Sequence, residues 1–97
     1  MSADNGIYIL ESPAGDGMME YRVAHTQAID NLDFYREQDN QQEYEDYLKR
    51  TWGSSEVFRT EDAALVKAKS MYDELIQQGY PIEYGISDIV IDHMFPQ

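Results

Sequence analysis

The chain contains no cysteine among its 97 residues. This absence excludes a disulfide framework, a thiolate zinc site and a cysteine nucleophile. The sequence also lacks a run of about 20 apolar residues, the length that a membrane-spanning helix needs. Residues 1–6 carry neither a basic segment nor an apolar one, so no secretory signal is predicted and we expect a cytoplasmic protein.

Basic residues are scarce, since seven Lys and Arg stand against nineteen Asp and Glu, a net charge of −12. Such a charge repels nucleic acid and anionic membrane surfaces, and it favours basic protein surfaces, including nucleic-acid-binding grooves. We therefore expect a basic nucleic-acid-binding protein as partner, with no direct contact to nucleic acid or to a membrane. The alternative is that the acidity only keeps a small protein soluble.

The usual catalytic motifs are also missing. No G-x-S-x-G elbow is present, and the glycine pair Gly15 and Gly17 has no neighbouring lysine to cradle a phosphate. Asp92 and His93 are adjacent, so on a strand their side chains would point to opposite faces. The sequence predicts a non-enzymatic protein with no metal and no cofactor. The alternative is a small enzyme in which His25 or His93 meets carboxylates in a cleft.

The apolar residues, 42% of the chain, predict one folded domain over residues 1–97. Residues 6–11 and 19–25 predict an antiparallel hairpin, because turn-forming residues fill positions 12–17 between them. Residues 56–59 predict a short third strand. Residues 82–93 predict a long last strand, which lies in the centre of the sheet or carries a bulge near Ser87.

Helical spacing of apolar residues recurs in two places. The clearest helix is predicted over residues 61–78, with Thr60 as its N-cap. A second helical face appears over residues 43–52, and Thr26 is predicted to cap a helix that follows it. Whether residues 27–52 form one helix or two stays open. The expected fold class is α+β, with about four strands in a mainly antiparallel sheet and two or three helices packed on one face.

Residues 30–46 hold seven acids and one arginine, a net charge of −6, with tyrosines interleaved. Carboxylates along a helix can imitate the phosphate repeat of a nucleic acid, and rings can enter pockets that stack bases. The alternative is a solvated helix face beside a tyrosine core stripe. The candidate partner-binding residues are Asp33, Glu37, Asp39, Glu43 and Asp46 for their charge and Tyr44 for its ring.

Three sequence blocks, together about a third of the chain, resemble a group of small proteins encoded by phages and prophages. They are SADNGIYIL at residues 2–10, EYRVAH with QAIDN at residues 20–31, and EYGISDIVID at residues 83–92. The resemblance implies a phage-linked origin and assigns no role to any single residue. Small acidic phage proteins often inhibit host defence nucleases such as CRISPR effectors and restriction enzymes, an association of origin and not of physics.

These observations lead to two hypotheses for the function. The first is a non-enzymatic inhibitor or modulator in the host cytoplasm, of the anti-CRISPR or anti-restriction type, that binds a basic nucleic-acid-handling protein through residues 30–46. The second is an interaction module or homodimer that works through a sheet edge or an apolar patch without mimicry. Its candidate contacts are Tyr8, Tyr21, Phe58 and Tyr84.

Overall fold

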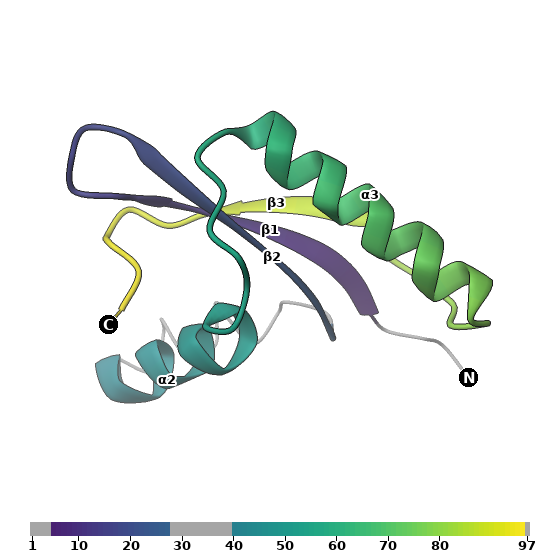
Figure 1. Cartoon of the computed structure of the whole chain (residues 1–97). Helices are drawn as coiled ribbons and strands as arrows, with labels where there is room; N and C mark the ends of the chain where they lie inside the picture. The colour runs from purple at the N-terminus through teal and green to yellow at the C-terminus, as the bar shows by residue number, and fades with distance from the viewer. Residues whose placement is uncertain (1–4, 28–39, 97) are drawn as a thin grey trace.

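A three-stranded mixed sheet lies between two helices (Figure 1). The computed structural model describes residues 5–27 and 40–96. In chain order the elements are β1 (Asn5–Pro13), β2 (Met19–Gln27), α2 (Gln41–Trp52), α3 (Glu61–Gln77) and β3 (Ile86–Val90). The strand order in the sheet is β2-β1-β3, so the α+β class is confirmed while the sheet is smaller than predicted.

The predicted hairpin is present, and its strands are longer than expected. β1 and β2 pair antiparallel along all nine residues of each strand. The loop between them closes with a hydrogen bond from the Ala14 N–H to the Met18 carbonyl at 2.9 Å. Thr26, predicted as a helix cap, pairs with Gly6 inside β2 instead. Thr26 does not cap a helix, because the next residue, Gln27, is still paired with Asn5 in the strand. The helix predicted after it falls on residues 28–39, outside the described residues.

The central strand is β1, and β3 runs parallel to it at one edge of the sheet. Residues Ile7, Tyr8, Ile9 and Leu10 are all buried, the pattern of a strand covered on both faces. The prediction that the last strand lies in the centre was therefore wrong. Val90 in β3 is 60% exposed, and no bulge interrupts the regular pairing of β3 with β1.

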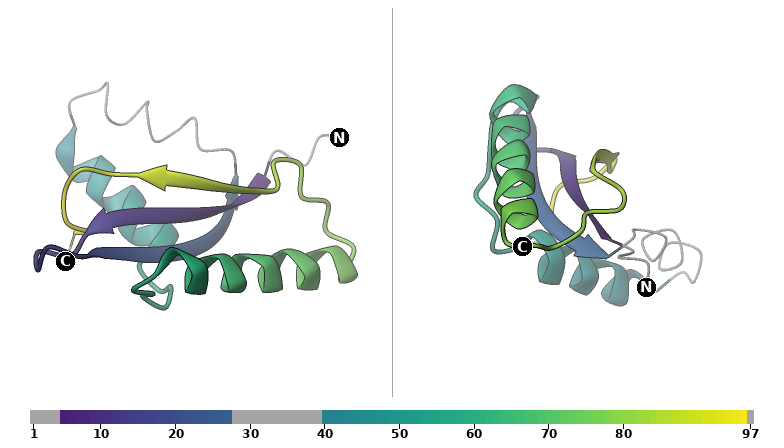
Figure 2. Two further views of the ribbon diagram at one scale, coloured as in Figure 1. Left: turned by 90° about the horizontal axis from the view of Figure 1, so that it is seen from above. Right: turned by 90° about the vertical axis from the view of Figure 1, so that its right-hand side faces the viewer.

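The helices cover opposite faces of the sheet, which corrects the expectation that they share one face. Tyr8 and Leu10 pack in one hydrophobic cluster with α2, whereas Ile7 and Ile9 pack in another with α3. Alternate residues of a strand point to opposite faces, so the apolar run of β1 supplies both clusters. Figure 2 shows the sheet between the two helices, with β3 along the edge away from α3.

Both helices begin after a residue whose side chain caps the first turn, and of these caps Thr60 was predicted. The side chain of Asn40 accepts from the Glu43 N–H at 3.2 Å, and that of Thr60 accepts from the Ala63 N–H at 3.2 Å. The helix that contains Tyr44 thus starts at Gln41. The predicted stripe of α3 is confirmed, because its members face the sheet: Ala64, Ala68, Met71, Tyr72 and Leu75.

The predicted third strand over residues 56–59 is reduced to one bridge. Tyr21 and Phe58 exchange two backbone hydrogen bonds of 2.8 Å, and Ser55 Oγ accepts from the Val23 N–H at 3.0 Å. The connection between α2 and α3 spans residues 53–60 and pairs with β2 only through this bridge. This connection covers part of the outer edge of β2.

Candidate partner-binding surfaces

The residues predicted to bind a partner fall into three groups. Asp33, Glu37 and Asp39 lie outside the described residues. Glu43 and Asp46 are exposed on α2, as their positions off the buried stripe predicted. They lie three positions apart on the helix, so their carboxylates are neighbours on its surface. Asp46 also accepts a hydrogen bond of 2.9 Å from the Gln42 side chain.

Tyr44 lies in the core, only 5% exposed. Its hydroxyl is 3.1 Å from Nε2 of His93, and the two rings meet edge to face with centroids 5.4 Å apart. A ring held in this way is already packed against its own chain. The hypothesis that the ring stacks in a partner's pocket therefore does not fit its position. Tyr44 instead packs in the core between α2 and the sheet.

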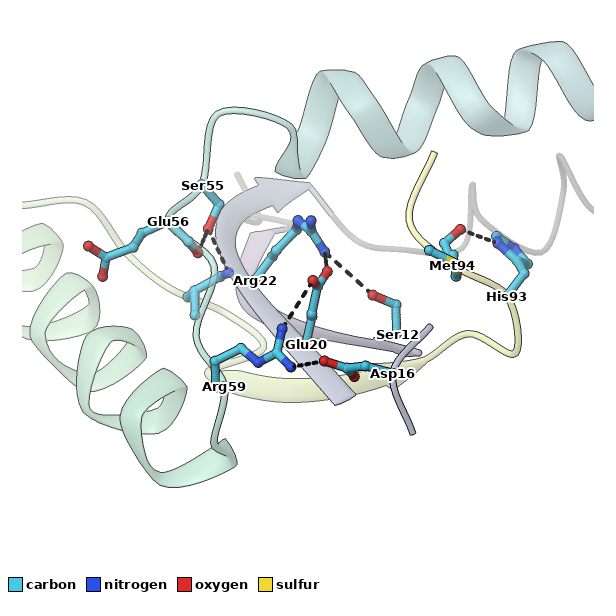
Figure 3. Close-up of polar contacts among 10 residues, drawn as sticks. Ser12, Asp16, Glu20, Arg22, Ser55, Glu56, Arg59, His93 and Met94 are labelled. Atoms are coloured by element: carbon cyan, nitrogen blue, oxygen red, sulfur yellow. Dashed lines mark hydrogen bonds and ion pairs between the residues drawn. The ribbon is translucent and has the colours of Figure 1, made fainter. Parts of the chain in front are cut away.

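Among the described residues, the acids Asp16 and Glu20 are held by arginines at the loop end of the hairpin (Figure 3). Arg59 Nη2 lies 2.7 Å from Asp16 Oδ2, and Arg59 Nη1 lies 3.5 Å from Glu20 Oε1. The hydrogen bond from Arg59 is the main reason that the pKa of Asp16 lies below its usual value of 3.8. These contacts join the hairpin loop to the connection that leads into α3.

Arg22 is a buried cation, 8% exposed, on the α2 face of the sheet. Its Nη1 lies 3.1 Å from Glu20 Oε2 and 3.4 Å from Ser12 Oγ, and its guanidinium lies 3.9 Å from the centre of the Phe95 ring. A buried charge needs such partners to offset its desolvation. Arg22 and Glu20 therefore act within the fold, where they fix the C-terminal segment against the sheet.

A group of acids surrounds Tyr21 on the α3 face. A hydrogen bond to Glu11 is the main reason that the pKa of Tyr21 lies above 10.0, and the charges of Glu61 and Asp88 raise it further. Glu11 pairs across the sheet with Tyr21 on one side and Val90 on the other. Sequence reasoning missed this grouping, because it depends on the strand order.

The outer edge of β3 exposes backbone groups that could pair with a further strand. The Ile7 N–H donates to the Gly85 carbonyl at 2.8 Å, and the Ile91 N–H donates to the Glu11 carbonyl at 3.0 Å. In a parallel ladder, the residues that bond to the neighbouring strand alternate with residues whose backbone groups point away from it. The groups that point away from β1 are those of Ile86, Asp88 and Val90.

The two histidines lie apart in the fold. His25 is exposed on β2, and His93 follows β3 and contacts Tyr44. Within residues 5–27 and 40–96, no three His, Cys, Asp or Glu side chains are grouped so that they could hold a metal ion. Neither of the helices in this part of the chain has the length and apolar character to cross a membrane.

No protein-family model, curated protein or solved structure matches the chain. Within residues 5–27 and 40–96, the surfaces open to a partner include the outer face of α2, where Glu43 and Asp46 are exposed together with Lys49 and Arg50, and the outer edge of β3.

Proposed function

We propose that the protein is a non-enzymatic inhibitor or modulator that binds a basic, nucleic-acid-handling protein of a host cell. The observation that carries this proposal is the exposure of Glu43 and Asp46 on α2, while the tyrosines of that helix form the core behind them. The surface is thus supported by Tyr44, Tyr47, Leu48 and Trp52, all of which are buried. A rigid helix presents carboxylates at fixed spacing, as a phosphate mimic requires.

The balance of charge supports the same proposal. Arg22 and Arg59 form ion pairs with Asp16 and Glu20. These two acids lie in and next to the hairpin loop and are not part of α2. Residues 30–46 carry a net charge of −6 in the sequence, half of the total of −12. A basic groove would be attracted to a chain with this charge and oriented by it before contact. The resemblance to phage proteins favours a host defence nuclease as the partner protein that carries this groove.

The test is retention of host proteins on the immobilised full chain, followed by release in salt steps from about 0.1 to 1 M, because exposed charge pairs are screened in this range. Retained proteins should bind DNA or RNA, leave the column at low salt and be displaced by added duplex DNA. The double variant Glu43→Lys with Asp46→Lys should lose them.

A matched control is the double variant Asp73→Lys with Glu74→Lys, which changes two exposed acids on α3 by the same charge. It should retain the same proteins as the unchanged chain. If charge reversal on α2 leaves retention unchanged, or if both double variants lose it equally, the α2 surface is not the binding site and the proposal fails.

A second candidate function is an interaction module, or a homodimer, that acts through its sheet edge. The observation that favours it is β3, an edge strand with outward backbone groups and with Val90 largely exposed. Association of this kind should resist high salt, because backbone hydrogen bonds and apolar contacts are screened much less than exposed charges.

A further inference from the structure

The edge formed by β3 lacks most of the features that protect sheet edges. Natural edge strands commonly carry lysine, proline or a bulge that prevents pairing with another chain. β3 has the sequence ISDIV, without proline or lysine, and pairs regularly with β1 along its five residues. Its single charge is Asp88. Among the described strands, none pairs with its outer side.

Side chains near this edge combine an apolar and an acidic character. Asp88 and Val90 lie on the α3 face, because their partners across the ladder are Ile9 and Glu11. α3 packs mainly over β1 and β2, so Asp88 and Val90 are exposed (Figure 2). On the other face, Ile89 packs against the cluster that includes α2.

The charge of this region selects among possible occupants. Residues 70–97 contain five acids and no lysine or arginine. A second copy paired antiparallel around Asp88 would bring two Asp88 carboxylates together and would join two chains of net charge −12. A basic segment would instead place a cation beside Asp88 and neutralise its charge.

We propose that the outer edge of β3 binds an extended, basic segment of a partner protein by strand addition. Backbone groups of the segment bond to Ile86, Asp88 and Val90, and the strand becomes the fourth of the sheet. On the α3 face its side chains follow the order apolar, Lys or Arg, apolar, opposite those same three residues. The inference does not depend on the α2 surface, since none of its contacts involves Glu43 or Asp46.

The probe is an eleven-residue, end-blocked peptide with Val-Thr-Lys-Thr-Val at its centre, about the length that a strand of this size can pair with. Titration into the ¹⁵N-labelled full chain should shift the amide signals of Ile86, Asp88 and Val90 and slow their hydrogen exchange. The same peptide with N-methyl groups on alternate backbone nitrogens should not bind, because it cannot complete the ladder. A peptide with glutamate in place of lysine should bind about tenfold more weakly, equivalent to about 1.4 kcal/mol.

Variants of the chain separate this edge from general acidity. Asp88→Lys should weaken the lysine peptide about tenfold and strengthen the glutamate peptide, whereas Asp73→Lys on α3 should change neither by more than twofold. Equal losses in both variants, binding of the N-methylated peptide, shifts confined to α2, or no saturable binding would each overturn the proposal. Protection of the three amides that appears with rising protein concentration alone would also overturn it, since a second copy would then be the occupant.

Discussion

The hydroxyl of Tyr44 lies 3.1 Å from Nε2 of His93 and joins α2 to the C-terminal segment. Nδ1 of the same ring lies 3.1 Å from the Met94 carbonyl, which can only accept, so Nδ1 carries the hydrogen. In the neutral ring, Nε2 is therefore the acceptor and Tyr44 the donor. The segment after β3 is thus held on both sides, by this bond and by Phe95 over Arg22.

Tyr44→Phe should destabilise the fold by about 1 kcal/mol, because it removes one partly buried hydrogen bond and keeps the ring. Urea unfolding followed by circular dichroism measures this change. Tyr80→Phe is the matched control, since Tyr80 is 56% exposed and its substitution should stay within about 0.5 kcal/mol. Equal losses in the two variants would mean that the bond to His93 contributes nothing.

Val23→Ala should lower the free energy of unfolding by about 1.5–2.5 kcal/mol, because it removes two buried methyl groups that fill the space between β2 and α3. Val23 is 5% exposed and packs with Ile9 and Ala64. Val66→Ala is the control at 70% exposure on the outer face of α3, and it should be neutral or slightly stabilising because alanine favours helix. Similar free energies of unfolding for the two variants would contradict the placement of α3 on this face.

The ion pair of Asp16 with Arg59 predicts a loss of stability in acid. Hydrogen bonding to Arg59 lowers the pKa of Asp16 below 3.8 in the folded state, so its contribution is present above pH 3.8 and disappears as the pH falls through the lowered value. The stability difference between the unchanged chain and Asp16→Asn should therefore shrink from pH 6 to pH 3. Arg59→Gln should show the same shrinking difference from pH 6 to pH 3, with a somewhat larger loss at pH 6 because Arg59 also contacts Glu20. A difference that stays constant over this range would exclude the ion pair as its source.

The acids around Tyr21 predict that the stability of the fold depends on pH near the pKa of this tyrosine. Hydrogen bonding to Glu11 raises the pKa of Tyr21 above 10.0, so this interaction stabilises the fold fully below pH 10 and is lost as the pH rises through the raised value. Glu11→Gln should move the pKa of Tyr21 towards 10, as measured by NMR of the ring carbons. Glu61→Gln should produce a smaller change, because Glu61 acts through charge alone. A larger change in the Glu61 variant would reverse this assignment of causes.

Local chemistry was enough to predict the hairpin and both described helices. The cap Thr60, the helical face over residues 43–52 and the periodic stripe of α3 are decided by residues near each other in sequence. Tyr44 could also have been placed correctly, because it belongs to the stripe that contains Tyr47 and Leu48, and a stripe residue packs inward. Its acidic neighbours led to the opposite interpretation.

The order of the strands could not be predicted in the same way. Residues 7–10 and residues 89–91 are both apolar runs, and either run is compatible with a central strand. What decides the order is the parallel pairing of β3 with β1 and the return of Ile91 and Phe95 over the α2 face. These contacts join residues distant in sequence, so no local pattern reports the edge position of β3 or the acids around Tyr21.

Gly85 sets the direction in which the chain enters β3. Its φ is +64°, a left-handed conformation, and a Cβ added to it would meet no atom within 4 Å. Gly85→Ala should therefore cost about 1 kcal/mol through backbone strain alone, and Gly85→Asn should cost less, because asparagine tolerates this region better. Gly6→Ala should lower the free energy of unfolding through crowding and not through backbone conformation, since its Cβ would lie 3.1 Å from the Tyr84 Cβ and 3.3 Å from the Gly85 carbonyl. Urea unfolding ranks the three variants, and an asparagine variant no more stable than the alanine variant would show that conformation is not what position 85 requires.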